Sequence, residues 1–198
     1  MNVPNKITLC RIILSILLLV LIIFPMEKIG IDFPEFKIGD VIINSKYLIC
    51  GIIFMIASLT DFLDGYLARK YNLVTDLGKV MDAIADKVLV NGVLIVLAVE
   101  GFISVVVPVV IVSRDIFVDS IKMVAGQKSG AVGASKAGKF KTAFMLVGIT
   151  LLFFQDIPFS LFGVNFVSRT IIMIATVLSV ISGIQYYVKN KKYLFDTK

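Results

Sequence analysis

The sequence predicts an all-α, polytopic membrane protein with about six transmembrane helices, and three observations support this fold class. Hydrophobic residues make up 58% of the 198 residues, and only 17% are charged. The mean hydropathy of +0.96 is far above that of soluble domains, which are nearer half apolar and about a quarter charged. The apolar residues also form runs that approach the roughly 20 residues a spanning helix needs. We expect one domain over residues 1–198.

The predicted spans follow one another along the chain with mostly short connections. They lie near residues 7–24, 47–66, 80–99, 102–121, 140–155 and 167–188. The first run resembles a signal peptide, but no small-residue cleavage site precedes Pro25, so we interpret it as a retained span. Charged residues interrupt the second to fifth segments at one end, which makes them marginal by hydropathy alone. We expect residues 25–46 to lie along the outer membrane interface, and we assign them no function.

The distribution of basic residues predicts the orientation of these spans. Four of the 20 lysines and arginines fall in the odd-numbered connections, namely Lys28, Lys37, Lys46 and Arg169. Because basic residues concentrate on the cytoplasmic side of membrane proteins, we expect both termini to be cytoplasmic. We also expect a multi-pass protein of the cell membrane. The connection between the second and third spans then faces the cytoplasm.

An unusual set of aspartates surrounds that connection. On helices, the polar and small residues there share two faces: Asp61, Asp64, Gly65, Ala68 and Arg69 on one, and Gly78, Asp82 and Asp86 on the other. Two helices joined by a turn around Asn72 would bring four carboxylates into one pocket. A single acidic residue at a helix end is usually a solvated charge, and that interpretation stays open for Asp76. Four in register favour a function, because carboxylates at membrane depth are costly.

Clustered carboxylates repel one another, so they take up protons or bind cations. The sequence contains no histidine, so oxygen atoms would hold any metal and a carboxylate, lysine or tyrosine would move any proton. Oxygen ligands suit Mg²⁺, Mn²⁺ or Ca²⁺. Two such ions can clamp a phosphoryl transfer. Gly65, Ala68 and Gly78 leave bare backbone on the same faces, where a flat ligand could lie close.

The fixed residues from Asp61 to Asp86 resemble the full signature of the CDP-alcohol phosphotransferase family. The pattern is Asp61-x2-Asp64-Gly65-x2-Ala68-Arg69-x8-Gly78-x3-Asp82-x3-Asp86, with every fixed position and every gap matched. The resemblance implies transfer of a phosphatidyl or similar group from a CDP-linked donor to an alcohol, with release of CMP. It also implies two divalent ions, Mg²⁺ or Mn²⁺, in each active site and a homodimer.

The same resemblance implies roles for individual residues. Asp61, Asp64 and Asp82 would hold the metals on the pyrophosphate of the donor, and Asp86 would be both a metal ligand and the general base. The residues expected to contact the CDP donor are Asn5, Thr8, Gly65, Ala68, Arg69, Thr75 and Gly78. For Asn5 and Thr8 an alternative stays open, in which they cap an interfacial N-terminal helix.

A group of basic residues bears on the identity of the alcohol. It comprises Arg114 in "SRD" and Lys136, Lys139 and Lys141 in "VGASKAGKFKT", on the same predicted side as the aspartates. Glycine- and lysine-rich segments just before a helix are good anion sites, so these residues predict a phosphorylated acceptor. The alternative is that they are ordinary cytoplasmic basic residues facing anionic lipid headgroups.

The start of the chain resembles the branch of the family that uses glycerol 3-phosphate as its acceptor. The matching positions are Pro4, Asn5, Thr8 and Arg11, with further similarity in "GKFKT" and "SGIQYYVKNKK". We therefore expect CDP-diacylglycerol, glycerol 3-phosphate and membrane lipids as partners, and no nucleic acid. Inositol phosphate, serine or phosphatidylglycerol stay open as other acceptors. A cation-coupled transporter and a structural membrane subunit are the alternatives from other classes.

Overall fold

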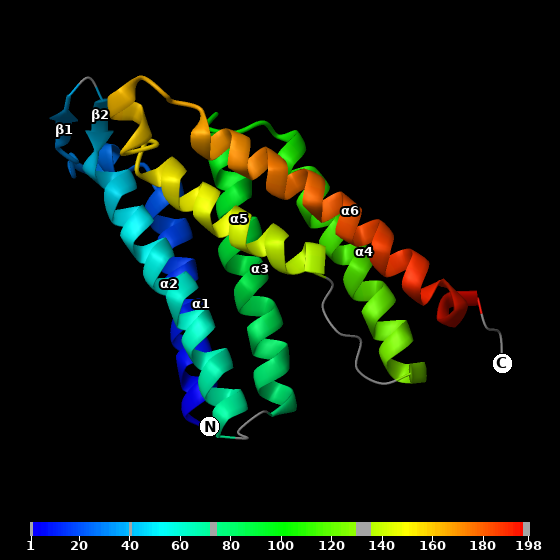
Figure 1. Cartoon of the computed structure of the whole chain (residues 1–198). Coiled ribbons are helices and arrows are strands. Elements are labelled where there is room, and N and C mark those ends of the chain that lie inside the picture. The colour runs from blue at the N-terminus through cyan, green and yellow to red at the C-terminus, as the bar shows by residue number, and fades with distance from the viewer. Residues whose placement is uncertain (1, 40, 72–74, 130–135, 196–198) are drawn as a thin grey trace.

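The computed structural model describes residues 2–39, 41–71, 75–129 and 136–195, and Figure 1 shows a helical bundle with a small hairpin at one end. The described residues form six α-helices, two 3-10 helices and two strands. The elements in chain order are α1 (Val3–Ile23), η1 (Met26–Ile29), β1 (Glu35–Ile38), β2 (Val41–Asn44), α2 (Ser45–Lys70), α3 (Asp76–Val99), α4 (Val106–Ser129), α5 (Lys136–Phe153), η2 (Phe159–Phe162) and α6 (Val167–Phe195).

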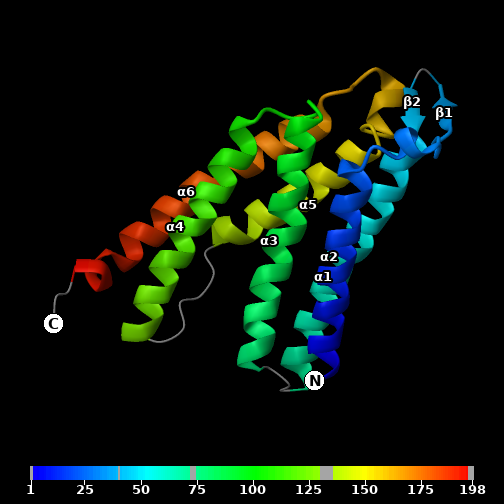
Figure 2. The same cartoon turned by 180° about the vertical axis from the view of Figure 1, so that it is seen from behind.

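The helices pack as two groups of three. Helix α1 packs against α2 and α3, and α6 packs against α4 and α5. Contacts of α2 with α5 and of α3 with α4 join the two groups. In both views the end of α2 and the start of α3 lie near the N-terminus, while the β1–β2 hairpin lies at the opposite end of the molecule (Figures 1 and 2).

A hydrophobic cluster runs through the interior and includes residues of every α-helix. Its members include Leu18, Phe54, Leu94, Ile111, Met145 and Ile172, one from each helix from α1 to α6. Gly148 on α5 allows α6 to approach closely, because a Cβ atom there would lie 2.6 Å from Cγ1 of Ile172. One domain over residues 1–198 stays a prediction.

Three helices of the described chain are long and apolar enough to cross a membrane: Val3–Ile23, Ser45–Ala68 and Val167–Lys191. Large apolar side chains on these helices, such as Leu17, Leu59 and Ile184, are exposed. A surface of this kind suits lipid rather than water. The protein is therefore membrane-associated, and six spans with cytoplasmic termini stay a prediction.

The predicted fourth segment, 102–121, begins too early. Helix α3 ends at Val99, and Gly101 with its φ of +79° turns the chain before α4 begins at Val106. The backbone N–H of Phe102 donates to the carbonyl of Leu97 at 2.9 Å and closes this turn. Hydropathy cannot separate such a turn from a helix, because the turn also contains an apolar, buried residue, Ile103.

The prediction for residues 25–46 missed a β-hairpin, so the fold is not purely α-helical. Strands β1 and β2 pair antiparallel, with Glu35 opposite Asn44 and Ile38 opposite Val41. At the end of the hairpin, Lys46 donates from Nζ to the carbonyl of Ile22 at 2.7 Å. That bond satisfies one of the carbonyls left free at the C-terminus of α1, and it ties the start of α2 to the end of α1.

Candidate active site

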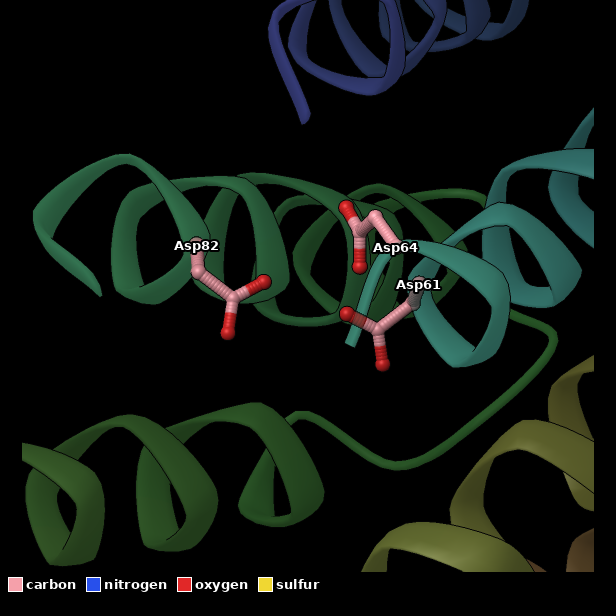
Figure 3. A group of neighbouring side chains, drawn as sticks. All are labelled: Asp61, Asp64 and Asp82. Carbon is pink, nitrogen blue, oxygen red and sulfur yellow. The ribbon is translucent and has the colours of Figure 1, made fainter. Parts of the chain in front are cut away.

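Three carboxylates converge between α2 and α3 (Figure 3). Asp61 and Asp64 lie about one turn apart on α2 and Asp82 lies on α3, and one oxygen of each comes within 4.8 Å of the others. Oxygens on opposite sides of a cation with bonds of about 2.0–2.6 Å would be about 4–5 Å apart. The set therefore fits a hard divalent cation. The structure brings together these three aspartates as the helical spacing predicts.

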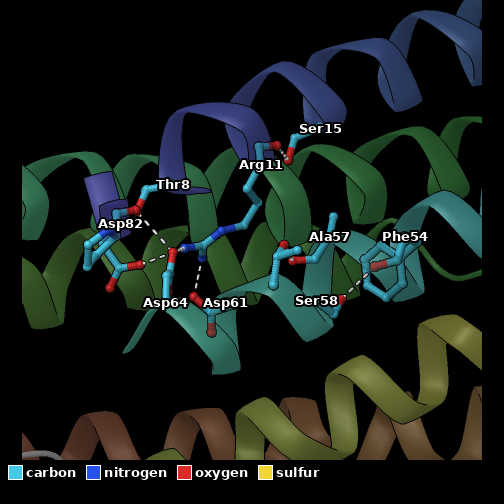
Figure 4. Close-up of polar contacts among 11 residues, drawn as sticks. Thr8, Arg11, Ser15, Phe54, Ala57, Ser58, Asp61, Asp64 and Asp82 are labelled. Atoms are coloured by element: carbon cyan, nitrogen blue, oxygen red, sulfur yellow. Dashed lines mark hydrogen bonds and ion pairs between the residues drawn. The ribbon is translucent and has the colours of Figure 1, made fainter. Parts of the chain in front are cut away.

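A buried arginine from α1 contacts all three carboxylates (Figure 4). Arg11 donates from Nη1 to Oδ1 of Asp61, and from Nη2 to Oδ2 of Asp64 and, at 3.0 Å, to Oδ1 of Asp82. Its side chain is 1% exposed, whereas those of Asp61 and Asp82 are 42% and 56% exposed. Arg11 thus lies on the buried side of the cluster, and Asp61 and Asp82 lie on its exposed side.

The side chain of Asp64 is the most enclosed of the three carboxylates, at 5% exposed. In addition to the bond from Arg11, its Oδ2 accepts a hydrogen bond of 2.9 Å from Oγ1 of Thr8. Thr8 also donates to the carbonyl of Pro4 at 3.1 Å, so its hydroxyl is shared between its own helix and the aspartate. The contact explains why a polar side chain is buried in an otherwise apolar helix.

Arg11 was not among the site residues predicted from the sequence, although it belongs to the N-terminal resemblance. A signal for it is present: Asn5, Thr8, Arg11 and Ser15 recur every three or four residues through the apolar α1, and all are buried. A polar stripe at helical spacing in an apolar helix indicates a face turned toward a polar interior. This stripe would have marked Arg11 as a residue that faces a polar interior, though not which residues it meets there.

Asn5 links α1 to the first turn of α3. Thr75 is the N-cap of α3, and its Oγ1 accepts hydrogen bonds of 3.0 Å from the N–H of Gly78 and 3.0 Å from Nδ2 of Asn5. A Cβ atom on Gly78 would lie 2.6 Å from Oδ1 of Asn5, so this position needs glycine for the close approach. The N-cap of α1 is Asn2, so the alternative in which Asn5 and Thr8 cap that helix is wrong.

Asp76, the first residue of α3, behaves as a solvated charge. Lys79 donates to its Oδ1 at 2.9 Å, and both side chains are exposed. This hydrogen bond and the ammonium charge hold the pKa of Asp76 below its usual value. A negative charge in the first turn of a helix is also favourable for the helix dipole. Asp76 lies apart from the three-carboxylate group.

Asp86 lies one turn beyond Asp82 on the same face of α3 and is exposed. It does not belong to the group of three carboxylates that the described residues bring within 4.8 Å. The charged groups that act on it electrostatically are Lys141, Asp115, Asp82 and Arg11. Asp86 is therefore within electrostatic range of the carboxylate cluster and of the predicted acceptor-binding residue Lys141.

Two of the predicted acceptor-binding residues meet at a carboxylate that the sequence prediction left out. Lys141, 8% exposed, donates from Nζ to Oδ1 of Asp115 at 2.8 Å, and Arg114 donates from Nη1 to the same oxygen at 2.9 Å. Arg114 also donates to α6, from Nε to the carbonyl of Ser179 at 3.0 Å and from Nη2 to Oγ of Ser182. The basic pair is thus held in place by α4 and α6.

For the remaining predicted site residues the structure gives at most a position in the fold and a degree of burial. Gly65 and Ala68 lie on α2, partly buried, and Lys139 is exposed near the start of α5. The side chains of Arg69 and Lys136 lie outside the part of the chain that the structure describes. Their predicted roles, and the donor contacts expected of Gly65 and Ala68, stay predictions.

A carboxylate cluster that could hold a divalent cation, in a helical membrane-associated bundle that also carries the buried Lys141 and the partly buried Arg114, suits an enzyme that acts on phosphate groups. The chain belongs to the CDP-alcohol phosphatidyltransferase family, whose sequence model matches residues 1–181. The resemblance seen in the aspartate pattern is therefore confirmed over nearly the whole chain.

Relatives with curated names share most of the length of the chain. It is 36% identical over 189 residues to the CDP-diacylglycerol--glycerol-3-phosphate 3-phosphatidyltransferase of Bacillus subtilis (strain 168), covering 96% of this chain and 95% of that protein. The protein of the same name from Rickettsia bellii (strain RML369-C) is 31% identical over 192 residues, covering 97% of each chain. The one from Mycoplasma genitalium is 36% identical over 150 residues, covering 75% of this chain and 63% of that protein.

Proposed function

We propose that the protein transfers the phosphatidyl group of CDP-diacylglycerol to sn-glycerol 3-phosphate, which gives phosphatidylglycerophosphate and CMP. The observation that carries this proposal is the convergence of Asp61, Asp64 and Asp82 in a chain of this family that also holds Lys141 and Arg114 on Asp115. The names of the relatives specify the same donor and acceptor. The product would enter phospholipid synthesis.

The carboxylate cluster would bind the donor through divalent cations. Asp61, Asp64 and Asp82 are the residues that would hold them, with Asp86 as a further ligand, and the all-oxygen donor set suits Mg²⁺ or Mn²⁺. We propose two such ions in each site. When bound, they would offset the negative charge of the pyrophosphate and of the departing CMP. The half-exposed side chains of Asp61 and Asp82 leave the cluster accessible from outside the bundle.

The positions predicted to contact the donor support this arrangement. Asn5, Thr75 and Gly78 form a hydrogen-bonded corner at the start of α3, on the helix that also carries Asp82. Gly78 keeps the backbone free of a side chain where α1 approaches. We propose that this corner, with Thr8 and the partly buried Gly65 and Ala68 of α2, receives the cytidine diphosphate. Arg69 would add a bidentate phosphate donor.

Asp86 would act as the general base. A base must reach the hydroxyl of the acceptor, and Asp86 is an exposed carboxylate within electrostatic range of both Asp82 and Lys141. It would take the proton from the primary hydroxyl of glycerol 3-phosphate as that oxygen bonds to the lipid-side phosphorus. The bond from this phosphorus to the oxygen of CMP breaks in the same displacement. A carboxylate suits the role in a chain without histidine.

The basic residues would bind the phosphate of the acceptor. The ammonium of Lys141 carries three N–H donors, of which Asp115 accepts one in the structure, so others remain for a phosphate. Arg114 contacts the same carboxylate and would add positive charge beside it. Lys139, exposed in the first turns of α5, and Lys136 at its N-terminus would complete the site.

We further propose a multi-pass protein of the cell membrane with six spans, and with the aspartate cluster on the cytoplasmic side. The end of α2 and the start of α3 lie at the same end of the bundle as the N-terminus (Figure 1). Most basic residues fall at this end or near the C-terminus, as expected for cytoplasmic segments. The homodimer expected of this family is part of the same proposal.

Release of CMP by the purified protein tests this function. The protein is incubated with CDP-diacylglycerol and Mg²⁺ in detergent micelles, and glycerol 3-phosphate, inositol phosphate, serine and phosphatidylglycerol are offered in separate reactions, each with and without a chelator. We expect chelator-sensitive release with glycerol 3-phosphate alone. Release with a different alcohol would retain the role of the aspartates and overturn the acceptor. Release with none of them would contradict the proposed function.

A further inference from the structure

We propose that Arg11 is a positioning residue that holds Asp61, Asp64 and Asp82 from the buried side, so that their remaining oxygens form the cation site. This inference rests on the proposed function, because it assumes that the three carboxylates bind a divalent cation. It concerns the only arginine or lysine that the described residues place in direct contact with all three.

The contacts divide the oxygens of the cluster into two sets. Arg11 binds Oδ1 of Asp61, Oδ2 of Asp64 and Oδ1 of Asp82, one oxygen of each carboxylate. Within the described part of the chain, the second oxygen of each accepts no hydrogen bond. Figure 4 shows the second oxygens of Asp61 and Asp82 directed away from α1 and from the guanidinium. The free oxygens of these two half-exposed aspartates therefore point away from Arg11, to the side from which a cation would arrive.

The charge and shape of arginine suit this role. Three carboxylates this close repel one another, and the exposed Asp61 and Asp82 would otherwise turn into water. A guanidinium stays charged at any working pH and presents several N–H donors in a rigid plane, which lets one side chain contact three acceptors. A lysine ammonium on a flexible stem would fix their relative positions less well.

Burial favours an arginine that stays in place when a cation binds. Arg11 is 1% exposed, its Nε is buried, and in the described structure Nε has no partner. If the guanidinium moved away to make room, the buried Asp64 would lose the positive charge that it pairs with, which is costly for a buried carboxylate. Groups that hold metal-binding carboxylates from behind typically raise metal affinity about 10- to 100-fold.

Binding of Mn²⁺ to the full-length protein in detergent, followed by the electron paramagnetic resonance signal of the free ion, tests the inference without requiring turnover. The variants are Arg11→Met, which keeps a long apolar side chain without the charge, and Arg11→Lys, which keeps the charge without the planar guanidinium. Leu18→Ala is the control, because Leu18 is fully buried on the same helix, two turns from Arg11, and its loss leaves a cavity away from the carboxylates. Binding is measured well below the unfolding temperature of each variant.

We expect Arg11→Met to weaken Mn²⁺ binding at least about tenfold. The Kd of Arg11→Lys for Mn²⁺ should lie between that of Arg11→Met and that of the native protein. Leu18→Ala should lower the Tm but keep the native Kd for Mn²⁺. Should Arg11→Met not fold, Arg11→Lys with a native Kd would overturn the inference. Binding by Arg11→Met that equals or exceeds the native affinity would also overturn it, because Arg11 would then be a bystander or a competitor of the metal. A native protein that binds no Mn²⁺ would overturn the metal site of the proposed function, and this inference with it.

Discussion

Lys141 on α5 and Asp115 on α4 form an ion pair in the interior, with Nζ 2.8 Å from Oδ1 and both side chains largely buried. Arg114 donates to the same oxygen at 2.9 Å. The basic residues proposed to bind the acceptor are therefore positioned before any phosphate arrives. Binding of the acceptor then loses less conformational entropy than it would if it had to order free side chains.

Asp115→Asn should raise the KM for glycerol 3-phosphate about tenfold and change the affinity for CDP-diacylglycerol little. The amide keeps the shape but loses the charge, so Lys141 and Arg114 each lose a charge-assisted hydrogen bond worth about 1.5–3 kcal/mol. Steady-state kinetics with each substrate varied in turn measure both effects. Asp119→Asn is the matched control, since Asp119 lies one turn further on α4 and pairs with Lys87 and Lys122. Equal effects of the two substitutions would count against a role for Asp115 in the acceptor site.

Gly78→Ala should reduce donor binding strongly. The new methyl group would lie 2.6 Å from Oδ1 of Asn5 and 3.0 Å from Oγ1 of Thr75, so it would push Asn5 out of the corner between α1 and α3. We expect the KM for CDP-diacylglycerol to rise at least about tenfold, since one lost hydrogen bond is worth about 1 kcal/mol and the displacement removes more than one. Gly126→Ala on α4 is the control, because a Cβ atom there meets nothing within 4 Å. Native kinetics for Gly78→Ala would refute this account of the corner.

Thr75→Ala should destabilise the protein by about 1 kcal/mol, the usual effect of losing a helix N-cap. Thr75 accepts the N–H of Gly78 and the amide of Asn5, and alanine leaves both donors without this partner. Thr75→Ser retains the hydroxyl and should stay close to native stability. Denaturant unfolding in detergent, followed by circular dichroism, measures the difference. If both variants unfold at the same denaturant concentration, the cap contributes nothing measurable.

Asp86→Asn should abolish turnover and leave donor binding largely intact. The amide cannot take a proton from the acceptor hydroxyl, whereas the three carboxylates within 4.8 Å of one another remain. CMP release and binding of CDP-diacylglycerol are measured on the same preparation. Asp76→Asn is the control, because Asp76 is exposed and pairs only with Lys79 among its described contacts. An active Asp86→Asn variant would rule out Asp86 as the base.

Much of the acidic site could be predicted from the sequence because it depends on local periodicity. Asp61 and Asp64 share a helix face, and Asp82 lies on the next helix after a short turn, so helical geometry alone brings them close. The signature of fixed residues and gaps predicted the family correctly. The six helices were also foreseen, with errors of up to eight residues at their ends, because apolar runs mark them.

The partners of these residues could not be predicted in the same way, because they come from distant segments. Arg11 meets Asp61 across 50 positions, and Lys141 meets Asp115 across 26. Each pair depends on how the helices pack, which no local pattern specifies. The β1–β2 hairpin was missed because its strands have only four residues each, too short for an alternating pattern to stand out beside long apolar helices.

The central claim is that this chain joins glycerol 3-phosphate to the phosphatidyl group of CDP-diacylglycerol, with divalent cations held by Asp61, Asp64 and Asp82. The most direct measurement follows radiolabelled glycerol 3-phosphate into extracted lipid, using purified protein in vesicles that contain CDP-diacylglycerol. We expect label in phosphatidylglycerophosphate in an amount equal to the CMP released. A chelator should abolish this incorporation and Mg²⁺ should restore it. The Asp61→Asn variant should incorporate no label. Label that stays in the aqueous phase while CMP is released, or incorporation that persists in the chelator, would contradict the central claim.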